Sequence, residues 1–291
     1  LMIQIDSATI RIIDTDNPVF VACHPFAVMS RPISSSAALH LNTHARVWGV
    51  VPCGGTGSRA GGDVPKQYRP VAGLPMVAHT LSALAEVSSI GGLLLAVAPG
   101  DEWHKRQMDG LPPGGLPQLP AVARRGSTWL RAMPVAGESR AHTVYNSLQT
   151  WRSWGADERD WVLVHDAARC LATPAQIYTL IDACLADPVG GLLALPLPDT
   201  LKQGVHNRAS VTVVREDKWL AQTPQMFRLG ELLYAMEAAK RSNFAQITDE
   251  ASAMEIQGQM PLLVQGSADN FKVTYPTDFA LAQAVIRSRT A

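Results

Sequence analysis

The residues with the clearest chemical pattern are the glycines and cations between positions 52 and 66. A loop of sequence Pro-Cys-Gly-Gly-Thr-Gly-Ser-Arg runs from Pro52 to Arg59, and Lys66 follows in a Pro-Lys-Gln segment. Glycines allow successive backbone N–H groups to turn toward one point, and such a concavity holds anions. With two fixed cations beside it, the loop predicts a site for a triphosphate, which needs backbone donors and nearby positive charge.

Other interpretations of this loop fit the sequence less well. Residues 55–60 match the G-x-G-x-x-A dinucleotide fingerprint, but Gly61, Gly62 and Pro65 prevent the continuous helix that it requires, and no acidic residue lies near position 75. The chain has no Gly-Lys-Ser/Thr sequence, which a Walker loop requires. A turn without a ligand is disfavoured, because Arg59 and Lys66 would repel each other unless an anion joined them.

Further polar segments could complete such a site. Asp166 follows the apolar run Trp161–Val164, and an acid at the carboxyl end of a strand can hold a ribose hydroxyl or help to place Mg²⁺. The structural alternative is an ion pair of Asp166 with Arg169 at a helix start, and we interpret the adjacent His165 as structural rather than as a base. Three other segments are candidates. Asp199–Lys202 with Arg215 could instead be a solvated hairpin, and Thr248–Ser252 could be only a helix start. Asp269–Thr274 could instead carry an ordinary edge-strand lysine.

The composition limits the class of protein. The 291 residues are 47% apolar and 17% charged, as in globular proteins, and the formal net charge of zero gives no basic field that would indicate nucleic acid. The sequence contains no apolar run of about 18 residues, so we expect no membrane span. Cysteines 23, 53, 170 and 184 form no CxxC pair and no metal spacing. We therefore interpret them as free thiols and expect a cytoplasmic protein.

The first 46 residues differ from the rest of the chain. They contain neither glycine nor lysine. We predict that residues 1–46 are an N-terminal extension, disordered or added by cloning, with a natural start as far in as Met29. A small accessory hairpin from Ile3–Ile5 and Ile10–Ile12 is the alternative.

From Val47 onward, apolar runs alternate with helical segments. Near-continuous apolar runs are typical of parallel strands that are covered on both faces. The alternation predicts an α/β fold with a doubly wound, mostly parallel sheet, in which ligands bind beyond the carboxyl ends of the strands. The expected strands are Val47–Val51, Gly92–Ala98, Trp161–Val164, Gly191–Leu195 and Leu262–Val264; the expected helices are Met76–Val87, Ala141–Trp154, Pro174–Ala186, Glu231–Arg241, Asp249–Gly258 and Tyr275–Ser288.

Two segments interrupt the alternation. Residues 111–134 contain five prolines, which predicts a surface insertion. Residues from about 197 to 218 contain the β-rich run Val211–Val214 between charges, which predicts a protruding β-arm. Such an arm often embraces a partner subunit.

Ten blocks in order make the chain resemble the 2-C-methyl-D-erythritol 4-phosphate cytidylyltransferases of the non-mevalonate isoprenoid pathway. They extend from Val47 over about five-sixths of the chain, and their order makes the resemblance specific. The blocks are VVPCGGTGSR, PKQY, APGD, GESRAHTV, VLVHDAAR, PDTLK, TVVRED, QTPQMF, ITDEASAME and ADNFKVT.

The resemblance implies a Rossmann-like nucleotidyltransferase domain over residues 47–291. It also implies a reaction that joins CTP and methylerythritol phosphate to give 4-diphosphocytidyl-2-C-methyl-D-erythritol and pyrophosphate. Arg59 and Lys66 would stabilise the transition state, and Arg215 and Lys272 would hold the sugar phosphate. Residues that support substrate positioning would be Thr200, Thr223, Thr248 and Asp166, and residues of the CTP site would be Pro52, Cys53, Gly54, Gly55, Gly57, Thr143, Asp166 and Ala167.

The resemblance also implies partners. In this family the arm crosses into the neighbouring subunit, so we expect a homodimer in which Thr200 and Arg215 serve the partner's site. We expect Mg²⁺ as the cofactor, held mainly by the CTP phosphates, with no dedicated metal ligands in the protein. We expect neither a nucleic-acid nor a membrane partner, and no second enzyme fused to the chain.

Some positions depart from the family pattern. The first loop usually has two alanines where Cys53 and Gly54 stand, its second half is often more basic than Ser58, and Pro usually stands at the position of Cys170. The 111–134 insertion is longer than expected.

Three other functions remain open. A ribitol-5-phosphate cytidylyltransferase shares the loop but resembles the chain less at VHDAAR and ITDEAS; a catalytically silent nucleotide-binding protein is disfavoured by the four retained cations; a dehydrogenase is disfavoured by the loop.

Overall fold

The computed structural model describes residues 2–6, 9–14, 17–18, 45–55, 64–102 and 129–290, and the chain divides into units 1–43 and 44–291. In the first unit, the strands β1 (Met2–Asp6), β2 (Thr9–Asp14) and β3 (Asn17–Pro18) pair antiparallel in that order. That residues 1–46 are an extension to the enzyme domain stays a prediction.

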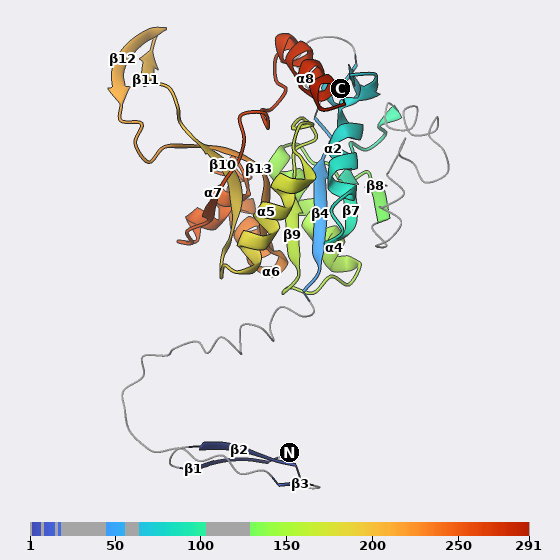
Figure 1. The fold of residues 1–291 in the computed structure, drawn as a ribbon, viewed down its shortest axis with the longest axis vertical. Helices are drawn as coiled ribbons and strands as arrows, with labels where there is room; N and C mark the ends of the chain where they lie inside the picture. The colour runs from blue at the N-terminus through green and yellow to red at the C-terminus, as the bar shows by residue number, and fades with distance from the viewer. Residues whose placement is uncertain are drawn as a thin grey trace. The chain divides into compact units, whose positions relative to one another are not determined.

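The second unit is built on a seven-stranded sheet with the order β14-β10-β13-β9-β4-β7-β8 (Figure 1). Neighbouring strands are parallel except around β13, which is antiparallel to both β10 and β9. The central strands β4 and β9 are buried almost throughout, as expected for apolar strands covered on both faces. The strands are β4 (Val47–Pro52), β7 (Ile90–Ala96), β8 (Trp129–Met133), β9 (Trp161–Val164), β10 (Gly190–Pro196), β13 (Trp219–Arg228) and β14 (Leu262–Gln265).

Helices cover both faces of this sheet (Figure 1). Successive side chains of a strand point to opposite faces, so Val51 of β4 joins the core under α2 and α5, whereas Val50 joins the core under α4, α6 and α7. A third cluster lies under α8. The helices are α2 (Met76–Ala85), η2 (Lys66–Tyr68, a 3₁₀ turn), α4 (Arg140–Ser153), α5 (Pro174–Leu185), α6 (Leu229–Lys240), α7 (Glu250–Ile256) and α8 (Pro276–Thr290), and β5 (Pro70–Val71) with β6 (Leu74–Pro75) forms a small hairpin.

The predicted α/β fold with a mostly parallel sheet is confirmed, with one correction and one addition. The prediction of a surface insertion over residues 111–134 is wrong at its end, because Trp129–Met133 forms the edge strand β8, parallel to β7. Residues 103–128 lie outside the described part of the chain. The antiparallel strand β13 was not predicted as a strand.

The order of the strands creates a switch point between β4 and β9. From β4 the chain builds β7 and then β8 on one side, and it returns to place β9 on the other side. The loops after β4 and β9 therefore diverge, and ligands of doubly wound folds bind in the crevice between such loops. The first loop begins at Cys53 and the second at His165, so the two polar segments predicted from the sequence meet there.

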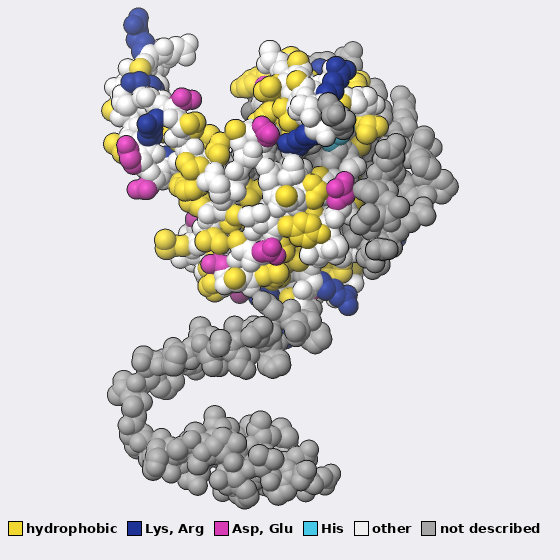
Figure 2. Space-filling model, viewed as in Figure 1, with side chains coloured by type: hydrophobic (Ala, Val, Ile, Leu, Met, Phe, Trp, Pro, Cys, Tyr) yellow, Lys and Arg dark blue, Asp and Glu magenta, His cyan; other side chains and the backbone are white. Residues whose placement is uncertain are grey.

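The predicted β-arm is present and leaves the body of the second unit (Figures 1 and 2). It consists of β11 (Leu201–Val205) and β12 (Arg208–Val213), which pair antiparallel. The turn residues His206 and Asn207 have φ of 48° and 61°, as in the type I′ turn of a two-residue hairpin. Every residue of the two strands is exposed apart from the half-buried Val213.

Candidate active site

A pocket of about 440 Å³ lies at the switch point. It contains nine residues that the sequence predicted for the site, drawn from the loops after β4 and β9, from η2, from α4 and from the segment before α8. These are Pro52, Cys53, Gly54, Gly55, Lys66, Thr143, Asp166, Ala167 and Lys272; Gln67, Gly137, Glu138, Ser139, Arg140 and Ala168 complete the lining.

The start of the glycine loop is fixed by a side chain that the sequence reasoning did not assign. The amide of the buried Gln67 donates from Nε2 to the carbonyl oxygens of Cys53 and Gly55, each at 2.9 Å. A Cβ atom on Gly54 would lie 2.2 Å from the Cβ of Ala136, so this position needs glycine. Gly54, where the family usually has alanine, therefore fits the close packing against Ala136. The predicted site residues Gly57 and Arg59 lie outside the described residues.

The two predicted lysines approach the pocket from distant parts of the chain. Lys66 Nζ donates to the carbonyl oxygen of Val273 at 2.8 Å, and Val273 directly follows Lys272. Lys272 Nζ donates to Asp166 Oδ2 at 2.7 Å. Although 207 residues separate Lys66 from Val273, Lys66 and Lys272 line one pocket. Two fixed cations beside a glycine loop suit a ligand with several phosphates.

Asp166 is held by two cations. Its Oδ1 accepts from Arg140 Nε at 2.7 Å, and its Oδ2 accepts from Lys272. Burial raises the pKa of the Asp166 carboxyl, but Arg140 and Lys272 outweigh burial and hold this pKa well below its ordinary value. The carboxylate is therefore ionised and aimed at the lysine.

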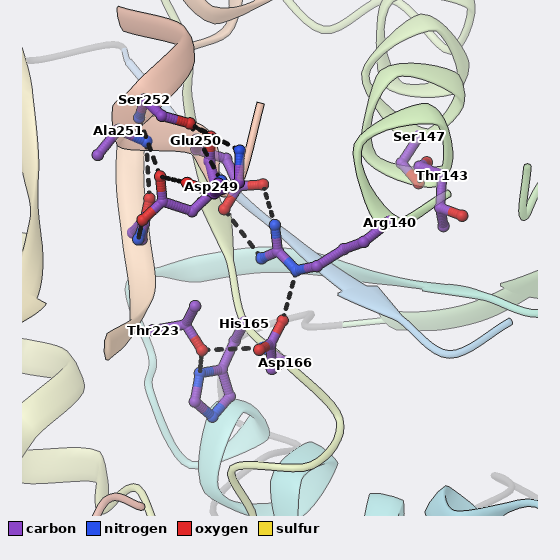
Figure 3. Close-up of polar contacts among 12 residues, drawn as sticks. Arg140, Thr143, Ser147, His165, Asp166, Thr223, Asp249, Glu250, Ala251 and Ser252 are labelled. Carbon is purple, nitrogen blue, oxygen red and sulfur yellow. Dashed lines mark hydrogen bonds and ion pairs between the residues drawn. The ribbon is translucent and has the colours of Figure 1, made fainter. Parts of the chain in front are cut away.

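Arg140 is held in turn by Glu250, and the sequence reasoning assigned neither residue to the site. Arg140 Nη1 and Nη2 donate to Glu250 Oε1 and Oε2 at 2.7 and 3.0 Å (Figure 3). Burial raises the pKa of the Glu250 carboxyl above its ordinary value, and Arg140 opposes this rise. The available signal was the position of each residue inside a recognised block, GESRAHTV or ITDEASAME. The helix start, which the sequence also predicted for the second block, is present, because Asp249 caps α7 in a capping box with Ser252.

A second set of contacts fixes the backbone of Asp166. The hydroxyl of Thr223 accepts from the Asp166 N–H at 3.0 Å and lies 2.9 Å from His165 Nδ1 (Figure 3). His165 Nε2 lies 3.1 Å from the carbonyl oxygen of Arg169, which only accepts, so Nε2 carries the ring proton and Nδ1 accepts from Thr223. The single hydroxyl proton of Thr223 is thus used inside the protein, and this buried residue does not line the pocket. These contacts agree with a structural His165.

The alternative pairing of Asp166 with Arg169 does not occur in the structure. Arg169 instead donates to the carbonyl oxygens of Asn270 and Ala221 at 2.6 and 3.1 Å. Asn270 Nδ2 donates to the carbonyl oxygen of Thr223 at 2.9 Å. These contacts join the segment that carries Lys272 to β13.

The other predicted positioning residues lie outside the pocket of this single chain. Thr200 and Arg215 are exposed at the base of the arm, where Arg215 donates to the carbonyl oxygen of Pro198. Thr248 is exposed just before α7. Thr143 does reach the pocket, and its hydroxyl donates to the carbonyl oxygen of Ser139 at 2.9 Å and accepts from Gly137 N–H at 3.0 Å. The roles of these residues toward a substrate stay predictions.

The environment of the cysteines that the structure describes does not favour a nucleophilic thiolate. Cys53, Cys170 and Cys184 are buried and free, and Cys23 lies outside the described residues. Burial raises the pKa of the Cys53 and Cys170 thiols to about 12, so both are protonated at neutral pH. Cys53 lines the pocket, whereas Cys170 packs in the cluster under α8.

Comparison with known proteins decides the family. Residues 47–288 match the sequence profile of the 2-C-methyl-D-erythritol 4-phosphate cytidylyltransferase family. The chain belongs to this family. A relative of that name from Paraburkholderia phytofirmans is 46% identical over 83% of this chain and 96% of its own length. A bifunctional IspD/IspF enzyme from Albidiferax ferrireducens is 51% identical over 86% of this chain, which spans about half of that protein, 55%.

Solved structures agree with the family assignment. A crystal structure of a 4-diphosphocytidyl-2C-methyl-D-erythritol synthase matches 84% of this chain and 99% of its own with 31% identity and a TM-score of 0.69. The cytidylyltransferase of Francisella tularensis matches 83% of this chain and 100% of its own with 28% identity and a TM-score of 0.67. The doubly wound fold is therefore that of a nucleotidyltransferase family.

Proposed function

We propose that this protein transfers the cytidylyl group of CTP to 2-C-methyl-D-erythritol 4-phosphate in isoprenoid precursor biosynthesis. The products are 4-diphosphocytidyl-2-C-methyl-D-erythritol and pyrophosphate. The observation that carries the proposal is the convergence of Lys66 and Lys272 beside the glycine loop at the switch point. Family membership supports methylerythritol phosphate, rather than ribitol 5-phosphate, as the acceptor.

The chemistry that this pocket supports is in-line substitution at phosphorus. A phosphate oxygen of the sugar phosphate attacks the α-phosphorus of CTP, and pyrophosphate leaves. Because the second pKa of a phosphate monoester is about 6, the attacking oxygen is already ionised near neutral pH and needs no general base. A mechanism without a general base is consistent with the structure, since both ring nitrogens of His165 form hydrogen bonds inside the protein.

Catalysis then rests on positioning and on charge stabilisation. Lys66 neutralises charge on the reacting phosphates, together with Arg59 in this proposal. Lys272 holds the phosphate of the acceptor, and its side chain is 37% exposed and therefore accessible from the pocket. Gln67 keeps the glycine loop in the shape in which its backbone contacts CTP.

Mg²⁺ enters the site with CTP in this proposal and is held mainly by the triphosphate. Within the described ranges, no three His, Cys, Asp or Glu side chains lie together as metal ligands. Among the described lining residues, the carboxylates belong to Glu138, which is exposed, and Asp166, whose oxygens both accept from cations. When bound, Mg²⁺ supplies positive charge to the phosphate oxygens.

The arm supports a homodimer as part of the proposal. An isolated two-stranded ribbon is marginally stable in water, yet β11 and β12 leave Val205 and Val211 about half exposed, at 49% and 50%. A second copy would cover these side chains and receive Arg215 and Thr200 in its own site.

We also propose a cytoplasmic location, which the free thiols of the described cysteines favour. In the described part of the chain, no helix has the length and apolar character needed to cross a bilayer.

Pyrophosphate release tests the proposal directly. The purified protein is incubated with CTP and Mg²⁺ together with methylerythritol phosphate, ribitol 5-phosphate or no acceptor. We expect release with methylerythritol phosphate and at most slow release in the other two reactions. Equal or faster release with ribitol 5-phosphate would assign the other acceptor, and CTP binding without any release would indicate a silent nucleotide-binding protein.

A further inference from the structure

Glu250 is the buried end of a chain of charges that leads into the pocket. It is the first residue of α7, and its side chain has no exposed surface. Its two oxygens accept from both terminal nitrogens of Arg140, in a bidentate pair that fixes the plane of the guanidinium. Glu250 itself does not line the pocket, whereas Arg140 does.

The remaining guanidinium nitrogen of Arg140, Nε, contacts Asp166. With Nη1 and Nη2 fixed, Nε is aimed at Asp166 Oδ1, 2.7 Å away (Figure 3). Asp166 Oδ2 is left to accept from Lys272 Nζ at 2.7 Å. The charges alternate along this chain from Glu250 to Lys272, so their formal sum is zero. Loss of the Glu250 charge would leave one surplus positive charge next to the pocket.

The backbone of Asp166 is fixed by separate contacts. The Thr223 hydroxyl accepts its N–H, and His165 accepts the Thr223 proton. What Arg140 decides is therefore the direction of the Asp166 carboxylate and, through it, the position of Lys272 Nζ. Without Glu250, two guanidinium nitrogens lose their acceptors, and the long arginine side chain becomes free to turn toward bound phosphate.

Stability alone does not explain this arrangement. Removing a carboxylate and a guanidinium from water is unfavourable, and apolar residues of similar volume often stabilise a protein as well as a buried ion pair does. A fixed direction for Asp166 is something that an apolar pair would not provide.

We propose that Glu250 is a positioning residue for cytidylyl transfer, acting through Arg140 and Asp166 on the ammonium group of Lys272. This inference rests on the proposed function. It predicts that Glu250 affects turnover and the use of the sugar phosphate more than the binding of CTP, since the surplus positive charge left by its loss does not repel a triphosphate.

The test compares Glu250→Gln with Glu237→Gln in the full chain. Glu237, which is exposed, provides a control that contacts the same helix, because its carboxylate also accepts from a residue of α4, the Tyr145 hydroxyl at 2.7 Å, but lies outside the pocket. Steady-state kinetics with CTP, Mg²⁺ and methylerythritol phosphate gives kcat and a KM for each substrate, and thermal unfolding gives Tm.

We expect Glu250→Gln to lower kcat at least roughly tenfold and to raise the KM for methylerythritol phosphate, because small misplacements of a reacting group reduce turnover strongly. The KM for CTP should stay within about twofold of wild type or fall, and Glu237→Gln should retain wild-type kcat. Glu250→Asp, which keeps the charge, should recover part of the lost turnover.

Several outcomes overturn the inference. Wild-type kcat in Glu250→Gln would do so, and so would an equal loss of kcat in Glu237→Gln, which would indicate general damage to α4. If Glu250→Gln does not fold, Glu250→Asp decides: reduced kcat with an unchanged KM for CTP supports the positioning role, and wild-type kcat excludes it. Inactivity of the wild-type protein itself would instead refute the proposed function.

Discussion

His165 should make the stability of this protein depend on pH in a window set by its burial. Burial lowers the pKa of His165 from 6.5 to about 4; the Asp166 charge and the hydrogen bond to the Arg169 carbonyl oppose this shift, and the charges of Arg169 and Arg140 add to it. The neutral ring also has a structural role, because its bare Nδ1 accepts from Thr223. The unfolded chain therefore binds a proton more readily than the folded chain between these two pKa values.

The sign and size of the effect follow from linkage. The contribution of His165 is complete above pH 6.5 and is lost as the pH falls toward 4, because the folded state must then either accept a proton on a buried ring or unfold. The difference between the two pKa values corresponds to about 3 kcal/mol in total. Between pH 7 and about pH 5, the expected loss is roughly 2 kcal/mol of the free energy of unfolding.

The perturbation that isolates this effect is His165→Gln, which keeps an amide donor for the Arg169 carbonyl but does not titrate. Urea unfolding of both proteins at several pH values from 7 to about 5 gives two curves of the free energy of unfolding. Other groups contribute to both curves, so their difference reports His165, and we expect it to shrink by roughly 2 kcal/mol as the pH falls. A constant difference would refute the reasoning, as would an NMR titration that placed the pKa of His165 near 6.5.

Three further predictions concern the pocket and the arm. Lys66→Ala should lower kcat at least about 10²-fold, on the scale of one lost charge-stabilising donor, and near-normal pyrophosphate release would contradict its role. Mixing inactive Arg59→Ala and Arg215→Ala proteins should restore part of the activity, because hybrid dimers contain one site with both arginines; no recovery would favour self-contained subunits. Gly54→Ala should destabilise the protein by about 1–3 kcal/mol through overpacking against Ala136 and raise the KM for CTP. Adding Ala136→Gly should reverse both effects, and a harmless Gly54→Ala would show that the loop relaxes freely.

The sequence predicts most of this fold because its strands are apolar runs and its helices are bounded by ordinary signals. The helix predicted from Thr173-Pro174 begins there, with Thr173 in a capping box. β13 escaped prediction because it carries Gln222, Thr223 and Gln225, polar residues that read as a loop, together with a proline. These polar side chains are buried in β13 and are satisfied by contacts with distant residues such as Ser267 and Asp249. Single-sequence patterns do not contain that information.

The residues of the candidate site also fall into those that the sequence could predict and those that it could not. The glycine loop, Lys66, Asp166 and Lys272 could be predicted, since each follows a strand or a recognised block, and the structure brings the described ones together. The pairing of Arg140 with Glu250 could not, because 110 residues separate them and each has an ordinary local explanation near a helix start. Only the folded structure, in which the first residues of α4 and α7 meet, reveals that their charges pair.

The ribbon formed by β11 and β12 has a consequence for how turnover is quantified. Its residues face water, and it carries no buried core of its own. If Arg215 at its base completes the neighbouring molecule's pocket, specific activity becomes a function of enzyme concentration, falling on dilution as associated chains separate while each chain keeps its own folded body. A rate per mole measured at a single dilution would then describe an association equilibrium as much as a chemical step.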